Sequence, residues 1–307
     1  MTMTFRTPMG WENYANSVIS KTRLLINQGI WDDIDELNLN RWLTNFRTPE
    51  SKYLAACILD AFSYRSKKMC HSMMRKIIMD VVPNYCREEK INNFDSIKGW
   101  LDNIGAADAL VRFVPVSISD GKIKSSAVVA REFIQANDIQ QRLIQQPENI
   151  QRAIDNGTKL IVFIDDFAGS GFQFLKFVQQ QNLLQFKGKV KFIYVPLAGH
   201  IDSIDRIHKK CDFIKIIPIE VLSRYQNFFY ECDEGFFRGD KTNSVQTAKD
   251  YYKTFCGNIF DNSKYLFGMS AQSLTYSFFF SCPNNNIKAL YHEQGADWRR
   301  LIFRGRS

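Results

Sequence analysis

The amino-acid sequence predicts an α/β protein, in which an open, mostly parallel sheet with flanking helices follows an all-helical N-terminal segment. Short apolar runs alternate with helical patterns between residues 109 and 222, as they do in parallel sheets with helical crossovers. These runs are apolar almost throughout, which is typical of strands buried on both faces. We therefore expect a helical N-terminal domain at 1–100 and an α/β domain at 101–307 with an irregular C-terminal segment.

The N-terminal segment contains three stretches with apolar residues at helical spacing. The first, WENYANSVISKTRLLINQGIW, ends at Gly29, and WDDIDELNLNRWLTNF follows it. The third covers residues 49–82, where Pro49 with Glu50 behind it makes a helix start. We expect Pro83 to end this helix, because proline disfavours the helical conformation of the residue before it.

Four buried strands are expected in the α/β domain. Each is followed by a loop, and the first three loops lead into helices, AVVAREFIQAN, FQFLKFVQQQNLLQF and IDSIDRIHKKC. After residue 222 the pattern weakens to one helix, an apolar run LTYSFFF and an irregular tail. The expected strands are ALVRFVPVSI (109–118), LIVFI (160–164), KVKFIYVPLAG (189–199) and DFIKIIPIEVL (212–222).

Composition narrows the class of protein. The formal net charge of +8 favours an anionic partner such as a nucleotide or nucleic acid. The seven cysteines, an odd number without a CxxC pair, argue against a disulfide framework and a cysteine zinc site. The first residues are too polar for a signal peptide, and no apolar run approaches the roughly 20 residues that span a bilayer. We expect a cytoplasmic protein without a membrane partner.

One stretch, LIVFIDDFAGSGFQF (160–174), combines an apolar strand with residues suited to a ligand. Asp165 and Asp166 stand where the expected strand ends, and ligands of open α/β sheets bind outside that edge. The loop at 167–171 then leads into a helix N-terminus, whose free N–H groups favour an anion. Its glycines allow close backbone approach, and the Ser170 hydroxyl can donate. The alternative is an ordinary solvated turn, in which Asp and Gly are also favoured.

This stretch resembles the phosphoribosyl-diphosphate motif of type I phosphoribosyltransferases: an apolar strand, two acidic residues, a few variable residues and Ser-Gly. The resemblance implies that Asp165 and Asp166 hold ribose hydroxyls and carry the catalytic role, with Mg²⁺ bound through the substrate and no direct metal site. It also implies that the loop holds a 5-phosphate. The segment Phe167-Ala168-Gly169 departs from the usual residues, so the geometry could be kept while the substrate differs. The loop candidates are Phe167, Ala168, Gly169, Ser170 and Gly171.

Two further segments follow strands of the same sheet. The loop SISDGKIKSS (117–126) stands where this fold binds pyrophosphate, and its Lys, Ser and Gly residues suit phosphate contact. An ordinary solvated loop is the alternative. His200 follows the third strand and could act as a base or phosphate contact, or only start a helix. The candidates in the first loop are Ser119, Asp120, Gly121, Lys122 and Ser125.

The C-terminal stretch LFGMSAQSLTYSFFFSCPNNNIKALYHEQGADWRRLIFR resembles a phosphoribosyltransferase-like effector family of bacterial conflict (anti-phage) systems. The N-terminal blocks RWLTNF and YLAACILDAFSYRSKKM also resemble that family. The resemblance implies a lid over the cleft formed by Asn284 and Asn285; turn formation is the alternative. Some members are encoded beside retron reverse transcriptases, which implies such an enzyme and its DNA–RNA hybrid as partners.

Two functions remain open at this point. The first is a toxin effector, a phosphoribosyltransferase-like transferase or nucleosidase that makes or breaks a bond at C1 of a ribose phosphate. Its ligand would be a nucleotide, a nucleic acid or a molecule like phosphoribosyl diphosphate. The second is a non-catalytic nucleotide- or nucleic-acid-binding component of a retron-type defence complex. The first fits a site with carboxylates and phosphate-binding loops, because fixing the sugar and stabilising the departing group can carry such reactions.

Overall fold

The protein is seen in a computed structural model that describes residues 4–91, 94–106, 110–117, 125–257, 259–260, 265–292 and 298–303. The chain divides into two compact units. Unit 1 combines Met1–Lys67 with Ser223–Arg306, and unit 2 consists of Lys68–Leu222. This division differs from the expected boundary near residue 100. The C-terminal segment packs with the first 67 residues, and the helices after Lys67 pack on the sheet.

Unit 2 is built on a parallel sheet with the strand order β2-β3-β4-β5, and β6 pairs with the end of β4. The prediction of an α/β fold with a parallel sheet, flanking helices and a helical N-terminal segment is confirmed. The strands alternate with helices along the chain, as parallel pairing requires. The strands are β2 (Val111–Pro115), β3 (Leu160–Ala168), β4 (Lys191–His200), β5 (Ile214–Ile216) and β6 (Glu220–Leu222).

Two strands differ from their predicted limits. β3 continues four residues beyond LIVFI, because it pairs with β4 as far as Ala168 opposite Gly199. The expected strand at 212–222 is divided into β5 and β6 around Pro218, which has no N–H to donate. The ladder nevertheless continues, since the N–H of Ile217 donates to Tyr194 at 2.8 Å and that of Ile219 to Pro196 at 3.1 Å.

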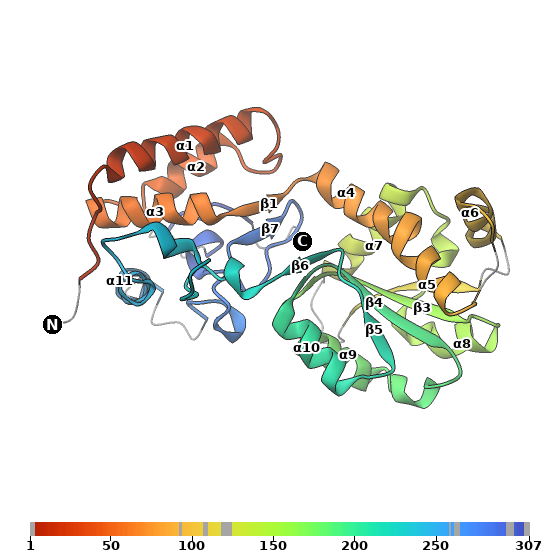
Figure 1. The fold of residues 1–307 in the computed structure, drawn as a ribbon. Coiled ribbons are helices and arrows are strands. Elements are labelled where there is room, and N and C mark those ends of the chain that lie inside the picture. Colours follow the sequence, from red (N-terminus) through yellow and green to blue (C-terminus); the bar gives the residue numbers. More distant parts are fainter. Residues whose placement is uncertain are drawn as a thin grey trace. The chain divides into compact units, whose positions relative to one another are not determined.

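Helices cover both faces of this sheet (Figure 1). On one face the α7 ring of Phe133 packs against Phe113 of β2, and Arg75 of α4 donates to the carbonyl of Ala136 at 2.8 Å. On the other face the rings of α9 pack against β3, with Phe177 5.4 Å from Phe163. The helices are α4 (Lys67–Lys76), α5 (Val82–Glu88), α6 (Ile97–Gly105), α7 (Ser125–Asn137), α8 (Ile150–Asp155), α9 (Phe172–Gln180) and α10 (Ile201–Lys210).

The helix expected at 49–82 is interrupted. It breaks at β1 (Ser63–Arg65), and α4 then continues through a π-helical turn, Ile77–Val81, into α5. Pro83 does not end the helix, as had been expected, but lies in the first turn of α5. Pro83 has no N–H to donate, and it lies where the helical hydrogen-bond series changes from the π-helical turn to α5, so the helix is not ended there.

Unit 1 brings the two ends of the chain together. β1 pairs in parallel with β7, so that Ser63 lies opposite Tyr276 and Arg65 opposite Phe278. Thr48 and Ser51 form a capping box that fixes the start of α3, with Pro49 in the first turn. The elements are α1 (Trp11–Asn27), α2 (Glu36–Leu43), α3 (Pro49–Ala61), β1, α11 (Val245–Gly257) and β7 (Tyr276–Phe278).

The C-terminal tail is irregular, as predicted, but it forms part of the unit 1 core. The indole N–H of Trp42 donates to the carbonyl of Ala289 at 2.8 Å, and that of Trp298 donates to the same carbonyl at 3.2 Å. Both tryptophans are fully buried, and Phe46 lies between them with its ring 5.5 Å from that of Trp298. The first helices and the tail therefore share one hydrophobic core.

Among the described residues, the helices are all too short or too polar to cross a membrane.

Candidate functional site

The candidate site lies at the carboxyl ends of β3 and β4, where the chain enters α9 and α10. Both strands end side by side, since Ala168 pairs with Gly199. Gly199 allows the next chain segment to approach, because a Cβ at this position would lie 2.8 Å from the ring of Pro218. The edge of the sheet therefore places the acidic pair and the glycine-rich turn beside the start of α10.

Asp165 belongs to the core face of the sheet. It is only 2% exposed, and the hydroxyl of Tyr194 donates to its carboxylate at 2.8 Å. The Tyr194 ring is held in turn by Phe174 of α9, against which it stacks with 3.7 Å between centroids. Burial and the neighbouring Asp166 carboxylate raise the pKa of Asp165 well above its usual value of 3.8. Burial and Asp165 also raise the pKa of Tyr194.

Asp166 follows Asp165 in the same strand and therefore lies on the opposite face of the sheet. It is half-buried, and its carboxylate accepts the N–H of Phe167 at 2.8 Å. The two carboxylates thus have different surroundings. Asp165 is fixed beneath α9, whereas Asp166 has partial access to solvent and can meet a ligand.

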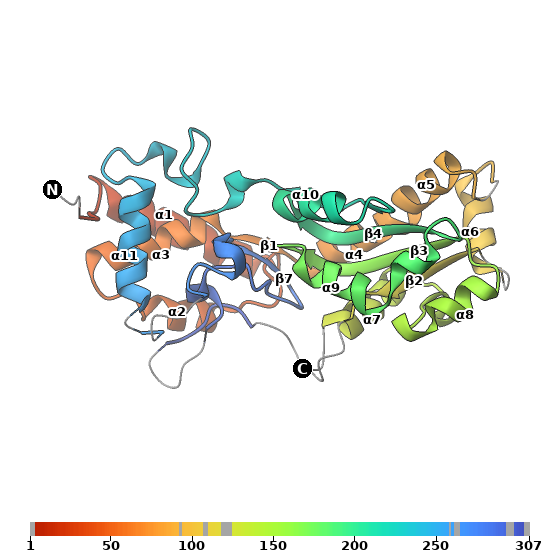
Figure 2. The ribbon, with the colours of Figure 1, turned by 90° about the horizontal axis from the view of Figure 1, so that it is seen from below.

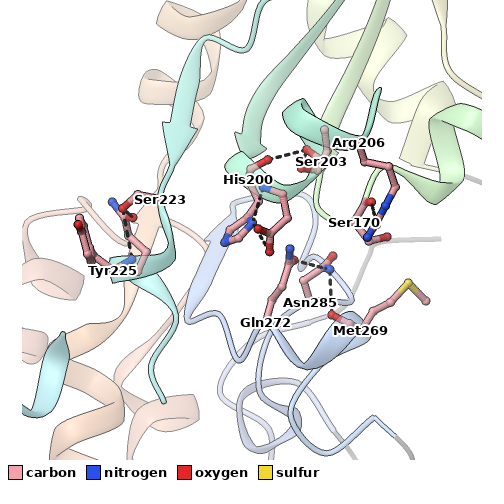
Figure 3. A network of polar contacts seen from close by, with 12 residues as sticks. Ser170, His200, Ser203, Arg206, Ser223, Tyr225, Met269, Gln272 and Asn285 are labelled. Atoms are coloured by element: carbon pink, nitrogen blue, oxygen red, sulfur yellow. Dashed lines mark hydrogen bonds and ion pairs between the residues drawn. The ribbon is translucent and has the colours of Figure 1, made fainter. Parts of the chain in front are cut away.

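Two side chains of α10 hold the turn at 168–171. The Ser203 hydroxyl lies 2.6 Å from the carbonyl of Ala168 and 2.7 Å from that of His200, so it joins the ends of β3 and β4. The Arg206 guanidinium donates to the carbonyl of Ser170, as Figure 3 shows. Arg206 also stacks over the ring of Phe172, 4.1 Å from its centroid. The turn is therefore positioned from α10 as well as from its own strand.

Gly171 makes the entry into α9. Its φ of +79° is in the left-handed region, which strongly favours glycine. A Cβ there would lie 3.3 Å from both the carbonyl oxygen of Ser203 and the side chain of Ile207. Because Gly171 has no side chain to cap α9, the amides of the first turn can receive an anion.

The PRTase-CE family matches residues 39–304 of the chain, which include all of unit 2 and most of unit 1. The chain belongs to the PRTase-CE family. The resemblance to a phosphoribosyltransferase-like family is thus confirmed at that level. Membership supports a phosphoribosyltransferase-like function with a ribose-phosphate ligand. No curated protein matches the chain.

His200 has a structural position in this PRTase-CE protein. It is fully buried, and its Nδ1 caps α10 by accepting the N–H of Asp202 at 3.2 Å. The Asp202 carboxylate lies 3.3 Å from the same nitrogen. The geometry agrees with a helix-start histidine.

The other predicted residues belong to the loop before α7 or to unit 1. Ser119, Asp120, Gly121 and Lys122 lie outside the described residues, and Ser125 begins α7 without a described side chain. Asn284 and Asn285 belong to unit 1, where Asn284 is exposed and its carbonyl accepts the N–H of Met269 at 2.8 Å. Asn285 is buried and donates to Met269 at 3.1 Å and to Gln272 at 2.7 Å (Figure 3). These bonds lie within unit 1, and the lid role of Asn284 and Asn285 stays a prediction.

Three residues that shape the site were not predicted. Tyr194, Ser203 and Arg206 contact the 165–171 segment from β4 and α10. A phenol within the apolar strand KFIYV was a weak signal for a buried polar partner, since a buried tyrosine hydroxyl usually finds one. Nothing local in the sequence of α10 indicated that Ser203 and Arg206 would contact a turn some 35 residues earlier.

Within the described parts of the chain, no group of three or more His, Cys, Asp or Glu side chains could hold a metal ion.

Proposed function

We propose that this PRTase-CE protein is a phosphoribosyltransferase-like effector of a bacterial anti-phage defence system. It acts on a substrate that contains ribose phosphate, either a nucleotide or a nucleic acid, and transfers or cleaves the glycosidic or pyrophosphate bond at C1. The observation that carries this proposal is the partly accessible Asp166 near the end of β3, followed by the Gly171 turn into an α9 helix without a side-chain cap. Carboxylate and amides then suit the two ends of a ribose 5-phosphate.

In this proposal each residue takes a role that its surroundings permit. Asp166 accepts hydrogen bonds from the ribose hydroxyls, while the amides of residues 169–172 and the Ser170 hydroxyl bind the 5-phosphate. Asp165, bonded to Tyr194, positions Asp166 through the strand that they share. A sugar fixed at both ends can reach an oxocarbenium-like state with little rearrangement, so the site needs no dedicated nucleophile.

A magnesium ion belongs to the proposal only as a substrate-bound ion. It would neutralise the charge of a pyrophosphate, for which Lys122 and Ser119 of the loop at 117–126 would supply further contacts. Asp166 would contact the ion or its water shell. These assignments extend the resemblance of the sequence to the phosphoribosyl-diphosphate motif.

The defence role is supported by the C-terminal and N-terminal blocks of sequence that resemble conflict-system effectors. By the same resemblance, the proposed partners are a retron reverse transcriptase and its DNA–RNA hybrid. The formal net charge of +8 is compatible with such a nucleic-acid partner.

A second candidate function is binding of a nucleotide or nucleic acid without turnover. It is favoured by the burial of Asp165, which leaves one acidic residue for the sugar, and by a separate cavity of about 310 Å³ in unit 1. Tyr225, Phe236 and Arg238 are among the residues lining this cavity. Aromatic and guanidinium groups bind bases by stacking, with little preference for sequence.

Calorimetric titration with phosphoribosyl diphosphate and with ribose 5-phosphate tests the site. Asp166→Asn should weaken both ligands, because the amide replaces two charged acceptor oxygens by one neutral oxygen and an NH₂ donor. Ser170→Ala should weaken them through the phosphate. Asp212→Asn is the matched control, since this carboxylate is exposed and bonds Lys187. Equal affinity in the Asp166 variant and the wild type would remove Asp166 from the site.

Turnover is tested by profiling nucleotides and free bases by mass spectrometry in bacteria that express the wild type or the Asp166→Asn variant. Each strain is measured with and without a neighbouring reverse transcriptase. Loss of one nucleotide in the wild type alone, with free base or ribose 5-phosphate appearing, supports the enzyme. Bound ligand that stays chemically intact after long incubation supports the binding function instead.

A further inference from the structure

A groove runs between α9 and α10 on the surface of unit 2. The two helices pack directly against each other, and both views in Figures 1 and 2 show them as neighbours. The groove encloses about 520 Å³. Its α9 side carries Phe172, Leu175 and Val178 beside the polar Gln179, and Leu184 of the following turn extends it. Its α10 side carries Arg206 and Lys210.

The α9 wall has exposed apolar side chains at its two ends. Its positions on the helix are Phe172, Leu175, Val178 and Gln179, which extend over about 10 Å, and Asn182 and Leu184 continue the wall past the end of α9. Phe172 is 58% exposed and Leu184 is 62% exposed. A groove of this length suits an elongated occupant better than a compact small molecule.

The α10 wall carries positive charge. Arg206 and Lys210 are four residues apart and therefore lie on one face of the helix. Asp212 also lines the groove, but its carboxylate is 3.1 Å from the ammonium of Lys187, which offsets its charge. The helix dipole favours a lysine at the end of α10, but it does not account for the exposed apolar wall opposite.

We propose that this groove docks an acidic amphipathic helix of a partner protein. An apolar face with side chains at i, i+3, i+4 and i+7 would pack on the α9 wall, as helix-in-groove recognition requires. Glutamate or aspartate flanking that face would then lie against Arg206 and Lys210. The combination of apolar length and one-sided positive charge selects this class of partner.

The groove is connected to the candidate site by residues that belong to both. Phe172 is the first residue of α9, and Arg206 both stacks on its ring and donates to the carbonyl of Ser170. A helix that packs on Phe172 and Arg206 therefore holds the turn at 168–171 in place. We infer that docking controls the phosphate-binding turn; this step rests on the proposed function, whereas docking itself does not.

Docking is tested on the full chain with a synthetic peptide probe of about 15 residues. The probe carries leucine at i, i+3, i+4 and i+7 and glutamate at its flanking positions, and a second probe has lysine for every glutamate. Fluorescence anisotropy should show binding of the glutamate peptide and much weaker binding of the lysine peptide. Failure of the glutamate peptide to bind, or equal binding of the two peptides, overturns the proposal.

Matched variants place the peptide on the groove. Leu184→Asp should weaken the glutamate peptide about tenfold, the size expected for an interface anchor. Leu24→Asp, at a leucine of α1 that is 59% exposed, should leave the affinity unchanged. Lys210→Glu should also weaken binding. Lys253→Glu makes the same change of charge on α11 and should leave the affinity unchanged. Equal effects at the groove and control positions would refute docking at this place.

The connection to the turn is tested by hydrogen exchange. The glutamate peptide should slow exchange of the amides at 169–174 in the wild type, and Arg206→Gln should reduce this effect more than it reduces binding. A separate titration with ribose 5-phosphate distinguishes the two proposals. If the peptide docks but ribose 5-phosphate does not bind, the docking surface stands and the proposed function fails; if exchange at 169–174 does not change, control of the turn is refuted.

Discussion

Asp165 is an acidic residue in a place where a charge is unfavourable. Its carboxylate is buried beneath α9, with Tyr194 as donor and a second carboxylate in the next residue. Such a group is stabilised by its hydrogen bonds and destabilised by the loss of water. The chain retains it at the point where the strand must present Asp166, which suggests that the position of the strand end matters more than its stability.

Replacement of Asp165 by Asn should reduce the pH dependence of stability. The pKa of Asp165 is raised in the folded protein, so the fold holds a proton that the unfolded chain releases above pH 3.8. Stability from this group is therefore present below that value and decreases as pH rises toward the raised folded pKa. Urea unfolding from about pH 4 to about pH 8 should show a smaller decrease for Asp165→Asn than for the wild type. A steeper decrease would contradict the argument, and Asp212→Asn serves as the exposed control.

The Gly171 turn gives a second test at the level of single residues. Gly171→Ala should destabilise the protein by about 2 to 4 kcal/mol, because left-handed strain adds to contact with Ile207 and Ser203. Gly157→Ala is the matched control: its φ is +91° but no atom lies within 4 Å of the added Cβ, so only the strain of about 1 to 2 kcal/mol remains. Chemical denaturation measures both values, and equal losses would show that the contact with α10 contributes nothing.

At the scale of elements, the sequence predicted whether a segment is a helix or a strand better than it predicted where that element begins and ends. The alternation of apolar runs and helices predicted β2, β3 and β4, because each strand is buried on both faces and reads as apolar. It did not predict that β3 would continue through Asp165 and Asp166, since its length depends on pairing with β4. The helix predicted at 49–82 was too long because SYR at 63–65 forms a strand only through its pairing with β7, which is distant in the sequence.

The link between β3, β4 and α10 can be tested through Ser203. Ser203→Ala removes the buried hydroxyl that bonds the carbonyls of Ala168 and His200, and should cost about 1 to 3 kcal/mol of unfolding free energy. Thr254→Ala, which removes an exposed hydroxyl from α11, should change stability by less than about 0.5 kcal/mol. Thermal and urea unfolding check both, and a neutral Ser203→Ala would show that the strand ends are held without α10.

At the scale of the whole molecule, the candidate site was partly predictable because its motif is local. Asp165, Asp166 and the turn at 167–171 adjoin in sequence and in space. Tyr194 and Arg206 come from other elements, and no pattern in their own segments indicated the contact. The make-up of unit 1 from both ends of the chain was not predicted for the same reason. A tryptophan at position 42 suggests a core residue, but nothing near it in the sequence indicates that Ala289 accepts its N–H.

Removal of residues 223–307 should therefore disrupt unit 1 and spare unit 2. Residues 1–67 would lose the aromatic core that they share with the C-terminal segment, whereas the sheet of unit 2 keeps its strands and helices. Limited proteolysis of the 1–222 fragment, followed by mass spectrometry, should release pieces from 1–67 while a fragment near 68–222 persists. Survival of the first 67 residues, or digestion of 68–222 at the same rate, would contradict the division into units.

The parallel pairing of β1 with β7 also has a consequence for synthesis. Between Arg65 and Tyr276 the ribosome must add roughly 210 residues, which takes about 10 to 40 seconds at about 5 to 20 residues per second. During that interval the sheet of unit 2 can fold near the exit tunnel. The apolar faces of the first helices remain exposed, because the C-terminal segment that packs on them has not yet been made. We therefore expect the N-terminal segment of a nascent chain to be prone to aggregation until translation is nearly complete.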